Sequence, residues 1–178
     1  MSVLPPSDSR PIRLPALAGV AAIVGLLALA APARAQTSSS ASVTADVQQP
    51  ITVTKTSDLA FGTIFPGLAK TVAVTDGGAA AFAIQGQAGG NVNLTFSLPT
   101  NITSGGGASL PITAWAARRA TTSAPAAGTD FVPGASAASA VLGGSGYLYV
   151  FLGATAQPSA SQPAGSYNGS ATMTVVYF

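Results

Sequence analysis

The sequence of 178 residues contains no cysteine, no histidine and no glutamate. Without histidine, the side chain that most often serves as a general base near neutral pH is missing. Without cysteine there is neither a thiolate nucleophile nor a disulfide, and zinc loses its usual ligands. We therefore predict that the protein is not an enzyme and holds no cofactor and no metal. Its stability must come from an apolar core and from strand pairing.

Charge is also scarce, at 7% of all residues. From residue 36 onward, four cations face four anions and the net charge is zero: Lys55, Lys70, Arg118 and Arg119 against Asp46, Asp58, Asp76 and Asp130. Binding of nucleic acid requires several clustered basic side chains to neutralise phosphates. Only Arg118 and Arg119 are adjacent, and we expect them in a solvated loop, so nucleic acid is excluded as a partner.

The first 35 residues have the features of a secretory signal peptide. Arg10 and Arg13 precede an apolar run over residues 14–31, and Ala33-Arg34-Ala35 fits cleavage after small residues. The apolar run is shorter than the roughly 20 residues that a membrane-spanning helix needs. We expect residues 1–35 to be cleaved and the mature chain to reach the periplasm, cell surface or extracellular space without entering the membrane.

The mature chain then divides into a flexible leader, residues 36–42, and a single domain, residues 43–178. Apolar residues alternate with polar ones in several segments of this domain, which is the period of a β-strand. Asp76-Gly77-Gly78 is typical of a hairpin turn, here between 71–75 and 81–85. In its first half we predict strands over residues 43–55, 59–65, 71–75, 81–85 and 91–98.

The second half contains two further apolar segments, 110–115 and 147–152, and a terminal strand within 165–178. Between them, residues 116–144 are rich in Ala, Ser, Gly and Pro, and predict a long surface connection with one short strand near 129–132. No helix is expected. Seven to nine strands separated by turns predict an all-β fold, an antiparallel β-sandwich.

The two ends of the domain are the candidate functional site, because an exposed strand edge pairs readily with another chain. If the first strand were donated to a neighbouring copy, the open-ended contact would build a fibre. The same residues would otherwise form the first strand of a self-contained monomer, and the sequence leaves both arrangements open. The donor residues would be Val43, Ala45, Val47, Ile51 and Val53.

Several segments together resemble a secreted bacterial domain of unknown function that is similar to common-pilus fimbrial subunits and to spore-coat U type proteins. They are the signal peptide, the Ala/Ser-rich leader, residues 43–53, Asp58-Leu59-Ala60-Phe61-Gly62-Thr63-Ile64 and the run from Ala164 to Gly169. The resemblance covers most of residues 43–178 but does not extend to the long connection. It implies an immunoglobulin-like, pilin-like sandwich.

Pilins of the chaperone-usher class carry a glycine fourteen residues from the end and a penultimate aromatic residue, and Gly165 and Tyr177 stand at those positions. The resemblance therefore implies a periplasmic chaperone as a partner through strand addition, besides self-association. The chain departs from better-known pilins in lacking a disulfide. The C-terminal assembly strand would comprise Gly165, Tyr167, Ala171, Met173, Val175 and Tyr177.

Three functions are compatible with these patterns. The favoured one is a secreted structural subunit of a bacterial surface appendage or coat that assembles by β-strand complementation, with a role in cell adhesion. The second is a monomeric secreted β-sandwich that binds carbohydrate or another surface ligand, with Trp115, Tyr147 and Tyr149 as a stacking platform, although the two tyrosines fit a core position better. The third is a small outer-membrane β-barrel, for which the alternation of the terminal strand is poorly suited.

Overall fold

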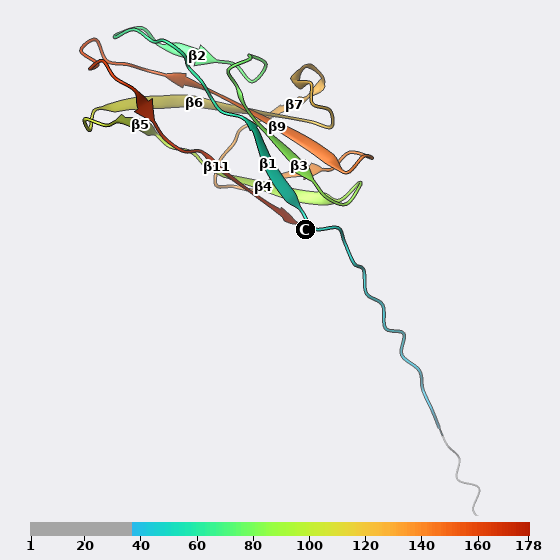
Figure 1. Ribbon diagram of the computed structural model, residues 1–178. Coiled ribbons are helices and arrows are strands. Elements are labelled where there is room, and N and C mark those ends of the chain that lie inside the picture. The colour runs from blue at the N-terminus through green and yellow to red at the C-terminus, as the bar shows by residue number, and fades with distance from the viewer. Residues whose placement is uncertain (1–36) are drawn as a thin grey trace, which may run out of the picture. The chain divides into compact units, whose positions relative to one another are not determined.

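The computed structural model describes residues 37–178, so the predicted signal peptide and Gln36 lie outside the described residues. The chain divides into two units, residues 1–43 and 44–178, and every strand belongs to the second unit (Figure 1). The described residues form a single 3-10 turn, η1 (Pro125–Ala127), and more strands than the seven to nine predicted: β1 (Thr52–Ser57), β2 (Lys70–Val72), β3 (Ala80–Gln85), β4 (Asn91–Ser97), β5 (Asn101–Ser104), β6 (Ser109–Ala120), β7 (Thr129–Phe131), β8 (Ala138–Val141), β9 (Tyr147–Ala156), β10 (Tyr167–Asn168) and β11 (Thr172–Tyr177).

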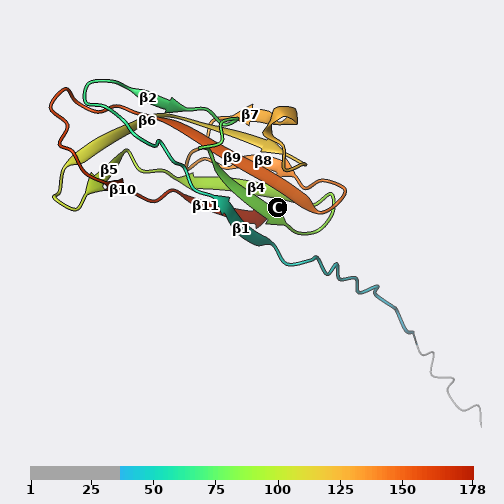
Figure 2. The same cartoon turned by 45° about the horizontal axis from the view of Figure 1, so that its top comes forward.

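The strands form two antiparallel sheets that pack as a sandwich. The larger sheet has the order β1-β3-β9-β6-β5-β10, with β2 also paired to β9 and β7 to β6. The smaller sheet has the order β11-β4-β8 and lies against one face of the larger one (Figure 2). The predicted fold class, an all-β antiparallel sandwich, is confirmed.

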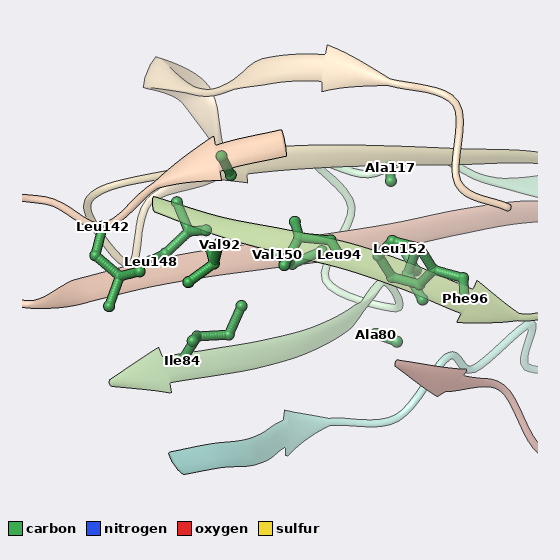
Figure 3. Close-up of a cluster of buried hydrophobic side chains, with 11 residues drawn as sticks. Ala80, Ile84, Val92, Leu94, Phe96, Ala117, Leu142, Leu148, Val150 and Leu152 are labelled. Carbon is green, nitrogen blue, oxygen red and sulfur yellow. The ribbon is translucent and has the colours of Figure 1, made fainter. Parts of the chain in front are cut away.

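The main core lies between the two sheets, where alternating side chains of β4 and β9 meet. In β4, Val92 and Leu94 are fully buried while Asn91, Asn93 and Thr95 point away. Leu148 and Val150 of β9 face them, and Ile84 of β3 completes the layer (Figure 3). This period of two is the pattern that an extended strand buries on one face, so local sequence and packing agree.

A second, smaller core occupies the far half of β6 and β9, and contains Leu110, Ile112, Ala154 and Ala156. Side chains of the segment 59–64, of β5 and of β10 pack against it and are only partly buried. This half of the larger sheet is therefore covered by connecting segments, and these leave part of its apolar surface accessible.

The prediction of a strand over residues 59–65 is wrong. These residues form an irregular segment that contains Gly62 at a φ of +64° and ends in a turn closed by the Leu68 amide and the Phe65 carbonyl, 3.1 Å apart. The apolar side chains that suggested a strand instead cover the second core. Pattern alone does not distinguish a buried strand from a segment that packs irregularly on a sheet.

The predicted hairpin around Asp76 is also wrong, although the turn itself forms. The Ala79 amide donates to the Asp76 carbonyl at 3.0 Å. Instead of pairing with each other, β2 and β3 lie end to end along the same edge of β9. Gly153 of β9 lies between these two pairings, and a Cβ at this position would clash with the carbonyl of Val72. Tertiary pairing with a long central strand thus overrides the local hairpin.

The segment 116–144 is more ordered than predicted. The strand expected near 129–132 is confirmed as β7, but β6 extends through Ala120 and β8 follows β7. Arg118 and Arg119 consequently lie in β6 and not in a solvated loop. Arg118 donates two hydrogen bonds to Asp130 on β7, and the Arg119 guanidinium lies 5.7 Å from the centre of the Phe131 ring.

Candidate functional site: an open side of the sandwich

One side of the sandwich is left open by two edge strands, β1 of the larger sheet and β11 of the smaller one. Both views place β1 and β11 next to each other (Figures 1 and 2), but they are not paired. β1 begins where β11 finishes, because the Tyr177 hydroxyl donates to the Gln49 carbonyl at 2.8 Å. An unpaired strand edge exposes backbone donors and acceptors that can bind an additional strand.

A groove runs along this open side from the end of β1. One wall consists of the end of β1 and residues 58–64, and the other consists of residues 165–171, which lead into β11. Its volume is about 1020 Å³. The floor is largely apolar and comes from three strands of the larger sheet: Phe82, Ile102, Leu110, Ile112 and Trp115.

Trp115 reaches this floor because β6 is irregular at that point. The pairing of β6 with β9 shifts between Thr113 and Ala116, and Ala114 has a φ of +50°, a left-handed conformation that is costly for a residue with a side chain. The Trp115 indole nitrogen donates to the Pro99 carbonyl at 3.2 Å. This hydrogen bond satisfies the polar edge of the indole and leaves its apolar surface to line the groove.

The β1 side of the groove is poorly suited to strand pairing. The pairing of β1 with β3 shifts between Lys55 and Ser57, which bends the strand. Lys55 lies on the inward face opposite Phe82, and its ammonium forms an exposed ion pair with Asp58 at 2.6 Å. Bulges and inward-pointing charges are two devices that protect sheet edges from unwanted pairing.

The β11 side has none of these protective features. Its six residues contain no charge, proline or glycine and pair with β4 without interruption. Met173, Val175 and Tyr177 pack onto the main core, so Thr172, Thr174 and Val176 point outward. The Tyr177 hydroxyl also accepts from the Gln87 amide at 2.7 Å. This rigidly held edge is therefore the better acceptor for an added strand.

The other predicted residues of the C-terminal strand form the wall that leads into β11. Gly165 has a φ of +153°, a conformation that favours glycine. Tyr167 belongs to β10 and pairs with Ser104 of β5, and its hydroxyl donates to the Pro163 carbonyl at 2.7 Å. Ala171 lines the groove. The predicted set is thus divided: Gly165, Tyr167 and Ala171 line one side of the groove, whereas Met173, Val175 and Tyr177 lie in β11 and pack onto the main core.

The structure separates the predicted donor residues into two groups. Val53 belongs to β1 and pairs with Ile84 of the same chain, and Ile51 packs against the main core. Val43 and Val47, in contrast, are 94% and 95% exposed, and Ala45 between them is exposed as well. The strand predicted over 43–55 is therefore wrong for its first nine residues, because β1 begins at Thr52 and residues 37–51 contain no strand. This segment therefore offers an alternating apolar face that no strand partner in the described chain uses.

The aromatic residues considered for a ligand platform do not lie on one surface. Trp115 is in the groove, whereas Tyr147 and Tyr149 are on the outward face of β9, opposite the buried Leu148 and Val150. The tyrosines are half-buried, so the expectation that they belong to the core is wrong. Their rings stack on each other with centroids 6.1 Å apart, which leaves one face of each ring for any other contact.

Besides the Lys55–Asp58 pair in the groove, the described residues contain one other ion pair, Arg118–Asp130, which lies outside the groove. The Arg118 guanidinium lowers the pKa of Asp130 by donating hydrogen bonds to its carboxylate, and the same contact raises the pKa of Arg118. Within residues 37–178, no three acidic, histidine or cysteine side chains come together as metal ligands, and no helix is long and apolar enough to cross a membrane.

Fold and groove together define an antiparallel β-sandwich with one open side, where a groove has an apolar floor. The chain belongs to the family described as a domain of unknown function (DUF4402), whose model matches residues 51–177. The family match begins just after the exposed segment that carries Val43 and Val47. No curated protein and no solved structure matches the chain.

Sequence reasoning located the walls of the site but missed most of its floor. Phe82, Ile102 and Ile112 appear in the sequence as ordinary strand residues, and only the pairing of β3, β5 and β6 in one sheet brings them together. The sequence offers one indirect signal, because the apolar side chains of residues 59–64 have to pack against some other part of the chain. Its partner cannot be identified from local pattern.

Proposed function

We propose that this protein is a secreted structural subunit of a bacterial surface appendage or coat, and that it assembles by donating residues 43–47 to the groove of a neighbouring copy. A single observation carries the proposal: a groove with an apolar floor, whose wall leads into the unpaired, uncharged edge strand β11, occurs in the same chain as an exposed segment with an alternating apolar face. The two have complementary chemistry. Strand addition satisfies the backbone of both, and alternate side chains fill the groove.

The direction of the incoming strand follows from the ends of the groove. Next to Tyr177, the open side is occupied by the chain's own Gln49, which accepts the tyrosine hydrogen bond. The donor must therefore enter from the opposite end, with residue 43 deepest and residue 49 nearest the entrance. That orientation is antiparallel to β11, which is the more stable and more frequent pairing of strands.

The same edge would accept a strand from a periplasmic chaperone before assembly. The likeness to common-pilus subunits and spore-coat U type proteins supports this step, as do Gly165 and Tyr177 at their characteristic positions. In this scheme the chaperone strand covers β11 during export and is later replaced by the donor segment of the next subunit. Adhesion would be a property of the assembled polymer.

A pair of double variants tests the proposal. Changing Val43 and Val47 to Asp places charges on the face that enters the groove, and we expect the purified protein to remain monomeric by size exclusion and negative-stain microscopy. Changing Thr44 and Gln48 to Asp adds the same charge to the opposite face, and this matched control should still assemble. Both pairs lie in an exposed segment, so the thermal midpoint should change little in either variant.

Two results would contradict the proposal. One is wild-type protein that stays monomeric at high concentration in the absence of any chaperone and that does not bind an added peptide of residues 37–51. The other is equal assembly of the two double variants, because the apolar face of the segment would then have no role in the contact.

A further inference from the structure

If the proposed function holds, neighbouring subunits have a second contact besides the donated strand. It would involve two apolar patches at opposite ends of the sandwich. We define the distal patch as Phe65 and Leu68, and the proximal patch as Val141, Val176 and Phe178. All five side chains are more than half exposed, with Phe65 at 64% and Leu68 at 63%. Exposed apolar patches on a small domain commonly mark interaction sites.

The distal patch is held rigidly. Phe65 and Leu68 flank a tight turn in which Gly67 has a φ of +73°. The Gly67 amide donates to the Ser159 carbonyl at 2.9 Å, and this bond fixes the turn to the segment that follows β9. Two large apolar side chains are thus presented to solvent on a turn that is closed by its own hydrogen bond and tied to the segment after β9, so little conformational entropy would be lost on binding.

The proximal patch lies where β11 finishes. Val141 of β8 pairs with Asn91 of β4, and the Phe178 amide donates to the Asn91 carbonyl at 3.3 Å, so these two residues flank the start of β4. Beside them opens a cavity of about 430 Å³. The cavity provides a recess next to the patch into which an apolar side chain of another molecule can insert.

The long strand β9 separates the two patches. Its first residue, Tyr147, pairs with Gln85 near Tyr177, and its last residue, Ala156, pairs with Lys70 and leads to Ser159. Ten residues of strand place the patches about 30 Å apart. Figures 1 and 2 show the connection before β2, which carries the turn, and the C-terminus at opposite ends of the sandwich.

Chain connectivity then brings unlike patches together. The donor segment enters the groove of a neighbour from the distal end, and in its own subunit it leads to Gln49 beside Tyr177. The proximal end of the donating subunit therefore lies against the distal end of the accepting one. We infer that Phe65 and Leu68 of each subunit pack against Val141, Val176 and Phe178 of the next, as a second apolar interface at every junction.

This interface has a defined consequence for assembly. The two patches differ, so the contact is heterologous and repeats without closing, which gives an open filament in the same direction as strand donation. Contact between the two patches would restrict the angle between successive subunits, whereas a donated strand alone would leave that angle free. The patches would therefore increase the stiffness of the filament and favour its assembly, and the groove would bind the donated strand.

The test distinguishes binding of the donated strand in the groove from contact between the distal and proximal patches. Changing Phe65 and Leu68 to Ser should raise the protein concentration needed for half-maximal assembly about tenfold or more, as expected for loss of a clustered apolar contact. A fluorescent peptide of residues 37–51 should still bind the groove within twofold of its wild-type affinity. For that measurement the acceptor is the full chain with Val43 and Val47 changed to Asp, with and without the Ser changes.

Two further variants sharpen the result. Val132→Ser removes a still more exposed apolar side chain on the connection after β7, and it should leave both measurements unchanged. Changing Val141 and Phe178 to Ser should reproduce the loss seen at the distal patch. Combining the two sets should cost no more than either alone, because both remove the same contact.

Failure of the inference and failure of the proposed function give different results. If the peptide binds and the Phe65/Leu68 variant assembles at the wild-type concentration, the end patches do not meet and the inference is overturned while strand donation stands. Additive losses on combining the two sets would also overturn it, since the patches would then have separate partners. If the peptide does not bind, strand donation itself fails, and with it the orientation on which the end contact rests.

Discussion

At the scale of single residues, Tyr177 connects the fold to the proposed assembly site. Its ring fits where Gly86 and Gly90 leave space, since a Cβ at either glycine would collide with the tyrosine side chain. Its hydroxyl accepts from the Gln87 amide and donates to the Gln49 carbonyl. One side chain therefore anchors β11, the turn before β4 and the point where the exposed N-terminal segment meets the sandwich.

We expect Tyr177→Phe to lower the free energy of unfolding by about 1 kcal/mol, because two hydrogen bonds are lost while the ring remains. Urea titration measures the change, with the slope against denaturant unaltered. Tyr149→Phe is the matched control, since no hydrogen bond of its hydroxyl occurs within the described residues, and it should have almost no effect. An equal loss in both variants would mean that the hydroxyl contacts of Tyr177 contribute nothing specific.

At the scale of elements, the two edge strands of the open side differ in their suitability for pairing. β1 carries a bulge and an inward-facing Lys55, whereas β11 is regular and uncharged. The strand β11 also packs three alternate side chains onto the main core, so its position does not depend on an added partner. This asymmetry predicts which edge takes up an incoming strand.

Hydrogen exchange tests the asymmetry. When a peptide of residues 37–51 is added to the full chain with Val43 and Val47 changed to Asp, the amides of β11 that do not pair with β4 should become protected at least tenfold. The free-edge amides of β1 should change much less. A peptide carrying Asp at positions 43 and 47 serves as the control. Protection confined to β1 would show that the incoming strand pairs with β1 and would contradict the prediction that β11 is the acceptor edge.

At the scale of the whole molecule, the proposed assembly would depend on apolar contact and backbone pairing. The described residues carry four positive and four negative side chains. Half of these charges are neutralised in two ion pairs, Lys55–Asp58 and Arg118–Asp130. Without net charge, long-range electrostatic steering between copies is weak. A neutral surface also places little repulsion in the way of self-association.

Assembly should therefore respond little to salt. We expect the rate of assembly to change less than about threefold between low and high ionic strength, because screening acts on charge pairs and these are few. Light scattering over a salt series measures it, with the Thr44/Gln48 Asp variant as a more charged comparison. A steep fall in rate with rising salt would point to charged contacts that the described surface does not explain.

The sequence alone was sufficient for several strands and for the fold class. The strands predicted over 91–98, over 147–152 and within 165–178 follow from alternation or from continuous apolar runs, which depend only on neighbouring residues, and they correspond to β4, β9 and β11, although β9 extends to Ala156. The same local information failed for residues 59–65 and for the hairpin around Asp76. In both cases the outcome depended on β9 and β6, which lie far away in the sequence.

The candidate site shows the same division. Alternation by itself predicted an apolar face on residues 43–47 and on β11, because side chains of a strand alternate regardless of context. Only the tertiary structure decided that β1 and β11 end their sheets side by side, that residues 58–64 form a wall and that Phe82, Ile112 and Trp115 form a floor. The physical reason is that strand pattern is local, whereas an edge is defined by the partner that it lacks.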